Sequence, residues 1–229
     1  CATGYLGRIR NLEPGEIYDQ VVSINRQARE TQGLPLTNIV LMGMGEPLLN
    51  YKNVLRAVEL VTSEKGLGMS TKRITLSTAG IAKMIKKLAD DHVRFNLALS
   101  LHAADDEKRN EIMPINETNN LKALKDALLY FYKETGNPIT LEYVALKNFN
   151  DHEKDAANLV RFASHFPCKI NIIEYNSIEH AEFQKSDTPQ LQKFVSVLEG
   201  KGLRVYIRKS RGEDIDAACG QLANKEIKS

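Results

Sequence analysis

The segment Arg73–His102 reads RITLSTAGIAKMIKKLADDHVRFNLALSLH and contains one strand–helix–strand unit. Its two short apolar runs are typical of buried strands, and the stretch between Ile81 and Ala89 has the pattern of an amphipathic helix. Small and polar residues follow each of the two strands. The segment therefore predicts a βα unit whose two parallel strands end in polar loops at the same edge of a sheet.

The same alternation of apolar runs and amphipathic stretches continues on both sides of this segment. It predicts one α/β domain over residues 1–222, built on a parallel sheet, and a polar tail over residues 223–229. Six strands are too few for a closed eight-stranded barrel, so we expect an open, partial TIM-like βα barrel. The expected strands are Asn38–Met42, Arg73–Leu76, Phe95–Leu99, Thr140–Ala145, Lys169–Glu174 and Leu203–Arg208. The expected helices follow Pro14 and Asn50 and otherwise span Ile81–Ala89, Leu121–Lys133, Glu153–Ser164 and Pro189–Leu198.

Composition narrows the class of protein. The chain has 229 residues and 42% hydrophobic content, which is enough for one sizeable core. No apolar run approaches the roughly 18–20 residues of a membrane helix and no signal-like segment opens the chain, so we expect a cytoplasmic protein. Three widely spaced cysteines favour reduced thiols over a disulfide framework. The net charge of +2 does not by itself indicate a nucleic-acid-binding protein.

Polar residues follow four of the predicted strands. They are the segment Gly43–Pro47, the segment Ser77–Gly80, the segment Ser100–His102, and Asn176. Because the carboxyl ends of parallel strands meet at one edge of a sheet, we expect these residues to form one site. Ser100 and His102 are two residues apart, so we expect both side chains to point the same way along the strand, into the barrel mouth.

Each of these residues also has an ordinary structural interpretation. Glu46 before Pro47 is typical of a helix start, and Ser77 is typical of a helix cap. A histidine such as His102 is often satisfied within the fold, and an asparagine such as Asn176 is common in turns. The residues alone leave both interpretations open.

Four segments, taken together and in order, resemble the motifs of radical S-adenosylmethionine (SAM) RNA methyltransferases, in particular the adenine carbon-2 methyltransferases of 23S rRNA and tRNA. The segments are Cys1-Ala2-Thr3-Gly4, Gly43-Met44-Gly45-Glu46-Pro47, Ser100-Leu101-His102-Ala103 and Ala217-Ala218-Cys219-Gly220-Gln221-Leu222. The resemblance implies SAM and a [4Fe-4S] cluster as cofactors, and RNA and an electron donor as partners of a monomeric enzyme. It also implies that the chain is N-terminally truncated and lacks the first barrel strand.

The resemblance assigns roles to individual residues. Cys1 matches the third cysteine of the family's cluster motif, so it is a cluster ligand in the full-length protein only. One cysteine cannot hold a cluster that takes several, and we therefore expect the isolated chain to contain no intact cluster. The residues expected to bind SAM are Gly45, Glu46, Ser77, Ser100, Leu101, His102 and Asn176.

Cys219 is the expected catalytic residue. By resemblance, it carries the methyl group from one SAM molecule to the adenine as S-methylcysteine. Basic neighbours favour the thiolate, the nucleophilic form. Arg208, Lys209 and Arg211 are candidates for contacts to RNA phosphates. The ordinary alternatives are a buried structural cysteine and a solvated run of charges.

Three rival functions remain at this point. The first is the related methyltransferase that acts on carbon 8 of adenine, which shares the Cys-Ala-Thr-Gly segment. The second is a metal-free nucleophilic enzyme that uses Cys219 and His102. The third is a non-catalytic module that binds SAM or RNA. Product analysis separates the first rival from the expected function, and iron analysis excludes or supports the second.

Overall fold

The computed structural model describes residues 9–178, 181–209 and 221. A six-stranded sheet runs through this part of the chain in the order β1-β2-β3-β4-β5-β6, and all five pairings are parallel. The strands are β1 Ile39–Leu41, β2 Ile74–Thr78, β3 Asn96–Ser100, β4 Ile139–Ala145, β5 Cys168–Glu174 and β6 Arg204–Arg208. All six predicted strands are confirmed, with ends that differ by at most two residues.

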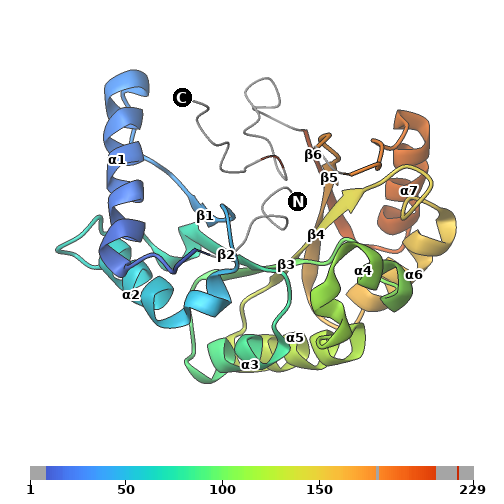
Figure 1. Cartoon of the computed structure of the whole chain (residues 1–229), viewed down its shortest axis with the longest axis horizontal. Helices are drawn as coiled ribbons and strands as arrows, with labels where there is room; N and C mark the ends of the chain where they lie inside the picture. The colour runs from blue at the N-terminus through green and yellow to red at the C-terminus, as the bar shows by residue number, and fades with distance from the viewer. Residues whose placement is uncertain (1–8, 179–180, 210–220, 222–229) are drawn as a thin grey trace.

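Helices cover the outer side of the curved sheet (Figure 1). They are α1 Pro14–Gln32, α2 Tyr51–Thr62, α3 Ala82–Asp90, α4 Asp106–Ile112, α5 Leu121–Thr135, α6 Glu153–Ala163 and α7 Thr188–Gly200. Short 3-10 helices span Pro47–Asn50, Thr71–Arg73 and Pro114–Glu117. The sequence did not predict α4, which begins where the Asp105 carboxylate accepts hydrogen bonds from the backbone N–H groups of Glu107 and Lys108.

The strand order equals the chain order, which is the winding of a βα barrel. Within the described residues, β1 pairs only with β2 and β6 only with β5, so the sheet is not closed. The predicted open, partial barrel is confirmed. Also within these residues, no helix combines the length and the hydropathy needed to cross a membrane.

The strand register separates an apolar face of the sheet from a polar one. Ser100 of β3 lies beside Glu142 of β4, which lies beside Asn171 of β5. Because side chains alternate along a strand, these three share one face and their neighbours Leu99 and Leu141 share the other. Both leucines are fully buried, in the core beneath the helices. The polar residues therefore lie on the inner side of the curved sheet, opposite the helices in Figure 1.

Candidate cofactor-binding site

Glu46 joins the ends of β1 and β2. Its Oε1 accepts a hydrogen bond from the Leu48 N–H at 3.0 Å, and its Oε2 accepts one from the Ala79 N–H at 2.7 Å. The first bond caps the helix Pro47–Asn50, as the structural interpretation expected. Burial raises the pKa of Glu46, and the hydrogen bonds from the Ala79 and Leu48 amides oppose that shift. The Thr78 side chain also donates to this carboxylate. The carboxylate thus has a structural role, and about one of its four lone-pair sites remains to accept from a ligand.

Gly45, next to Glu46, has a φ of 102° and is exposed. A side chain is strained in this conformation, whereas glycine adopts it freely. A Cβ at this position would meet no atom of the described residues within 4 Å. The backbone here is therefore open to a ligand.

Ser77 and Ser100 lie side by side at the carboxyl ends of neighbouring strands. Their Oγ atoms are 3.5 Å apart. Both side chains lie on the polar inner face of the sheet, and both residues are half-buried. The structure therefore brings together two hydroxyl groups that are 23 residues apart in the sequence.

His102 lies near Ser100, but not for the reason that the sequence suggested. Strand β3 ends at Ser100, and His102 has a left-handed φ of 58°, so the strand alternation expected for this pair was wrong. The imidazole is oriented instead by a hydrogen bond, in which its Nδ1 accepts from the Val144 N–H at 3.1 Å. This bond fixes the neutral tautomer in which Nε2 carries the hydrogen.

Burial lowers the pKa of His102 to about 3, and the charge of Arg109 lowers it further. The ring is therefore neutral at physiological pH and offers a hydrogen-bond donor rather than a positive charge. Leu101 is fully buried, and its N–H donates to the Glu142 carbonyl at 2.9 Å. The Leu101 carbonyl accepts a hydrogen bond from the Arg109 Nε at 3.0 Å, so only the second lone pair of this carbonyl remains for a ligand.

Asn150 is a residue that the sequence reasoning missed. Its Nδ2 donates to the carbonyl of His102 at 2.6 Å and to the carbonyl of Val144 at 2.8 Å, and its Oδ1 accepts from the Leu146 N–H at 2.7 Å. It therefore ties the loop after β3 to the end of β4. The segment Asn148–Asp151, which is polar except for Phe149 and begins three residues after the end of β4, is the signal that could have pointed to it.

Asn176 is buried and follows the end of β5 by two residues. It is thus at the same edge of the sheet as the other predicted site residues, since every strand of the sheet is parallel. Four strand ends bring Glu46, Ser77, Ser100 and Asn176 to this edge, with His102 just beyond. The structure therefore brings these five residues to one edge of the sheet.

Glu142, Asn171 and Arg208 form a polar cluster on the inner face that the sequence did not reveal. The Glu142 Oε1 accepts from the Asn171 Nδ2 at 2.8 Å, while Oε2 lies 3.7 Å from the Arg208 Nη1. Burial raises the pKa of Glu142, although Asn171 and the nearby cations oppose the shift. Arg208 is thus turned toward the inside of the sheet, not only toward solvent as a solvated charge run would be.

Cys1, Arg211 and Cys219 lie outside the described residues, and Lys209 is described as exposed.

Cys168 is buried, its Sγ is 3.6 Å from the Ala163 carbonyl, and burial raises the pKa of its thiol to about 11, as expected for an inert cysteine. Among the residues that the structure describes, no group of three or more His, Cys, Asp or Glu side chains could hold a metal ion.

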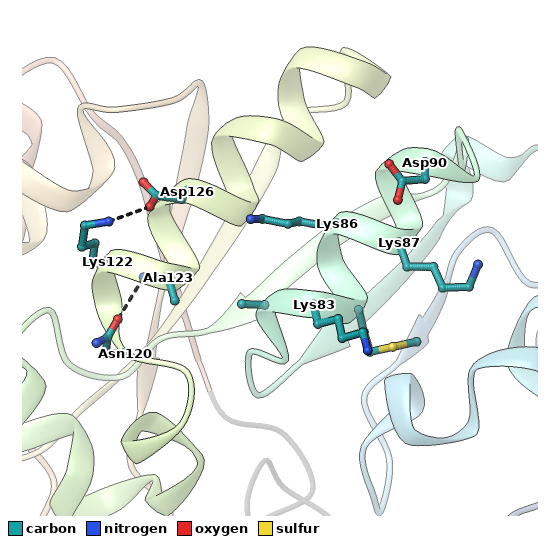
Figure 2. A pocket seen from close by; sticks show the side chains of 10 residues that line it. Lys83, Lys86, Lys87, Asp90, Asn120, Lys122, Ala123 and Asp126 are labelled. Atoms are coloured by element: carbon teal, nitrogen blue, oxygen red, sulfur yellow. Dashed lines mark hydrogen bonds and ion pairs between the residues drawn. The ribbon is translucent and has the colours of Figure 1, made fainter.

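A groove of about 680 Å³ lies elsewhere, between α3 and α5 on the outer side of the sheet (Figure 2). Four of its ten lining residues are lysines, among them Lys83, Lys86 and Lys122, the last paired with Asp126. None of the predicted site residues lines it. The strand-end edge, and not this groove, carries the convergent polar groups from which we build the site.

Comparison with known proteins agrees with this geometry. The family model for the radical SAM superfamily matches residues 1–160. The chain belongs to the radical SAM superfamily. In this family, SAM is the cofactor that the edge would hold, and the polar groups at four strand ends fit a molecule with amino, carboxylate and hydroxyl groups.

Similar proteins from this superfamily carry a more specific name. "Probable dual-specificity RNA methyltransferase RlmN" from Cytophaga hutchinsonii is 64% identical over 228 residues, and the alignment covers 100% of the chain and 62% of that protein. The protein of the same name from Flavobacterium psychrophilum is 55% identical over 227 residues, with coverages of 99% and 65%.

A solved structure shows the same radical SAM fold. It is the crystal structure of a radical SAM methyltransferase from Sphaerobacter thermophilus, which matches with a TM-score of 0.93 at 40% identity and covers 96% of the chain and 64% of that protein. The chain therefore spans less than two-thirds of the length of each of these three relatives.

Proposed function

We propose that the full-length protein is a radical SAM methyltransferase that modifies carbon 2 of adenine in 23S rRNA and tRNA. The observation that carries the proposal is the convergence of Glu46, Ser77, Ser100 and Asn176, from four parallel strand ends, in a chain of the radical SAM superfamily. The names of the relatives, dual-specificity RNA methyltransferases, support RNA as the substrate. We place the enzyme in the cytoplasm, as a monomer that receives electrons from a separate donor.

The described residues suit SAM binding. The Glu46 carboxylate suits the cofactor's ammonium group, and the open backbone at Gly45 allows close approach. The Ser77 and Ser100 hydroxyls and the neutral Nε2–H of His102 are donors for its oxygens, and the buried Asn176 amide suits an adenine or ribose edge. Leu101 contributes the second lone pair of its carbonyl.

Cys219 is the proposed methyl carrier. Its thiolate attacks the methyl carbon of SAM, so that a carbon–sulfur bond forms on Cys219 while the carbon–sulfur bond to the leaving S-adenosylhomocysteine breaks. In the full-length protein, Cys1 would be one ligand of the [4Fe-4S] cluster, which with a second SAM would supply the one-electron chemistry that activates this methyl group. A carrier is needed because carbon 2 of adenine is electron-poor and does not attack SAM directly.

RNA contacts are proposed for Arg208, Lys209 and Arg211. Phosphate contacts from such side chains position an RNA without reading its sequence. Because Arg208 lies 3.7 Å from Glu142 on the inner face, we expect it to meet RNA only at the mouth of the barrel, where an extruded adenine would enter.

The test replaces each of two cysteines in the full-length protein. Cys219→Ala should abolish RNA methylation and leave SAM binding unchanged, whereas the matched control Cys168→Ala should keep methylating, because Cys168 is buried on the helix-facing side. Peptide mass analysis of the wild type should find one added methyl group on Cys219. A Cys219→Ala variant that still methylates RNA would overturn the mechanism. Nucleoside analysis that finds 8-methyladenosine, and no 2-methyladenosine, would overturn the proposed position.

A further inference from the structure

Arg109 of α4 is fully buried and donates hydrogen bonds to two strand ends at once. Its Nη2 donates to the Ala79 carbonyl at 2.7 Å and to the Ser100 carbonyl at 3.2 Å, and its Nε donates to the Leu101 carbonyl at 3.0 Å. Ala79 follows β2 by one residue, and Ser100 is the last residue of β3. One side chain therefore connects the two loops that carry the paired serines.

A second set of hydrogen bonds, through Asn116, fixes the Arg109 guanidinium. Its Nη1 donates to the Asn116 Oδ1 at 2.7 Å, and the Asn116 Nδ2 donates in turn to side-chain oxygens of Asp106 at 2.9 Å and Asn110 at 2.7 Å. Gly80 lies against it as well, because a Cβ there would be 3.3 Å from the Arg109 Nη2. The orientation of the planar fork is thus set by packing and by hydrogen bonds.

The charge of Arg109 is buried without an ion pair. Among the described residues, no carboxylate oxygen lies within 4.0 Å of its nitrogens, and its four hydrogen bonds go to neutral oxygens. The charge of Asp106, which Arg109 reaches only through Asn116, favours the protonated form. Burial lowers its pKa to about 10, so it stays protonated at neutral pH. Burying an unpaired charge is costly, and lysine could not reproduce a fork with this geometry. A buried charged side chain between two strand ends therefore indicates a role beyond packing of the hydrophobic core.

We propose that Arg109 is a positioning residue for SAM, which holds the loops after β2 and β3 at the separation that the cofactor needs. It acts through the backbone of Ala79, Ser100 and Leu101 and does not contact the ligand. The separation at stake is that of the Ser77 and Ser100 hydroxyls, whose Oγ atoms are 3.5 Å apart. The inference rests on the proposed function, since it takes SAM to be the ligand of this edge.

The experiment compares Arg109→Lys with Lys108→Met in the full-length protein. Arg109→Lys keeps the positive charge and loses the fork, so its effect reports on geometry. Lys108→Met is the matched control, because Lys108 is the neighbouring cation of α4 but binds Asp155 and the Phe149 carbonyl, away from β2 and β3. Equilibrium dialysis with labelled SAM gives the dissociation constant, and a thermal melt of each variant gives its stability.

We expect both variants to melt earlier than the wild type. Arg109→Lys should also weaken SAM binding by about tenfold, as for the loss of one charge-assisted hydrogen bond, whereas Lys108→Met should leave it within about twofold. The KM for SAM should rise in Arg109→Lys, with kcat at saturating SAM little changed. Of the hydrogen bonds of Arg109, Asn116→Ser removes only the one that Nη1 donates to Asn116, so it should show an intermediate loss of affinity for SAM. This variant replaces Arg109→Lys in the test if Arg109→Lys does not fold.

Two results would separate the possible failures. If Arg109→Lys and Asn116→Ser melt earlier but bind SAM as the wild type does, Arg109 is only structural and the inference is wrong. If the wild-type protein with its cluster does not bind SAM, the proposed function is wrong instead.

Discussion

Gly80 offers the sharpest test of the packing beneath the site. Its φ is 108°, and a Cβ built on it would lie 2.9 Å from the Leu124 Cδ2, 3.1 Å from the Leu99 Cδ1 and 3.3 Å from the Arg109 Nη2. All three neighbouring side chains are fully buried and cannot move into solvent. Gly80→Ala therefore combines backbone strain with overpacking.

The magnitude follows from these two causes. A side chain held in a sparsely populated backbone region costs about 1–3 kcal/mol, and one extra methyl in a packed core costs about 1–3 kcal/mol. We expect Gly80→Ala to lower the free energy of unfolding by about 2–6 kcal/mol, the sum of the two. Because the added methyl also presses on Arg109, SAM binding should weaken in the same variant.

Gly136 provides the matched control. It ends α5 with a left-handed φ of 67°, and in the part of the chain that the structure describes a Cβ there would meet no atom within 4 Å. Gly136→Ala should therefore cost only the left-handed backbone penalty, about 1–2 kcal/mol. Urea unfolding of the full-length variants, followed by circular dichroism, measures both costs. Equal losses at the two positions would refute the packing argument, because only Gly80 has neighbours for its Cβ to meet.

Three further predictions concern buried charged or titratable groups. Burial raises the pKa of Glu142, so the folded protein binds more protons there than the unfolded chain and loses stability as pH rises through the folded-state pKa. Glu142→Gln should therefore unfold at a higher urea concentration than the wild type at pH 7. This increase in stability should disappear below the ordinary carboxyl pKa, and an increase that persists in acid would contradict the reasoning. The Lys108 Nζ and the Asp155 Oδ1 are 2.6 Å apart, with Asp155 buried and Lys108 partly exposed. In urea unfolding, Asp155→Asn should lower the free energy of unfolding by about 2–3 kcal/mol, somewhat less than the loss of a partner in a fully buried pair. An unchanged free energy of unfolding would show that the ion pair contributes nothing to stability. His102 should show an Nε2–H tautomer by nitrogen NMR with no titration from pH 8 to 5, because its pKa is about 3; a midpoint near 6.5 would exclude the buried Nδ1 contact.

The sequence alone was sufficient for the fold. Short apolar runs separated by amphipathic stretches predicted all six strands, since a buried parallel strand and a helix with one apolar face each leave a periodic pattern. It also placed Glu46, Ser77, Ser100 and Asn176 at one edge, because parallel strands must all end on the same side. The short helix α4 escaped notice because seven residues with mostly charged side chains show no apolar period.

Only the tertiary structure determined how the site is held together. The strand alternation applied to His102 was wrong, because β3 ends at Ser100 and the ring is oriented by a backbone N–H of β4, 42 residues away in the chain. Arg109, Asn150 and Glu142 look like ordinary polar residues in the sequence. Their roles depend on which carbonyls and amides from other segments surround them, and a local pattern carries no information about such contacts. Local periodicity thus determined the strands and their polar ends, whereas long-range hydrogen bonding decided the separation and orientation of the groups on them.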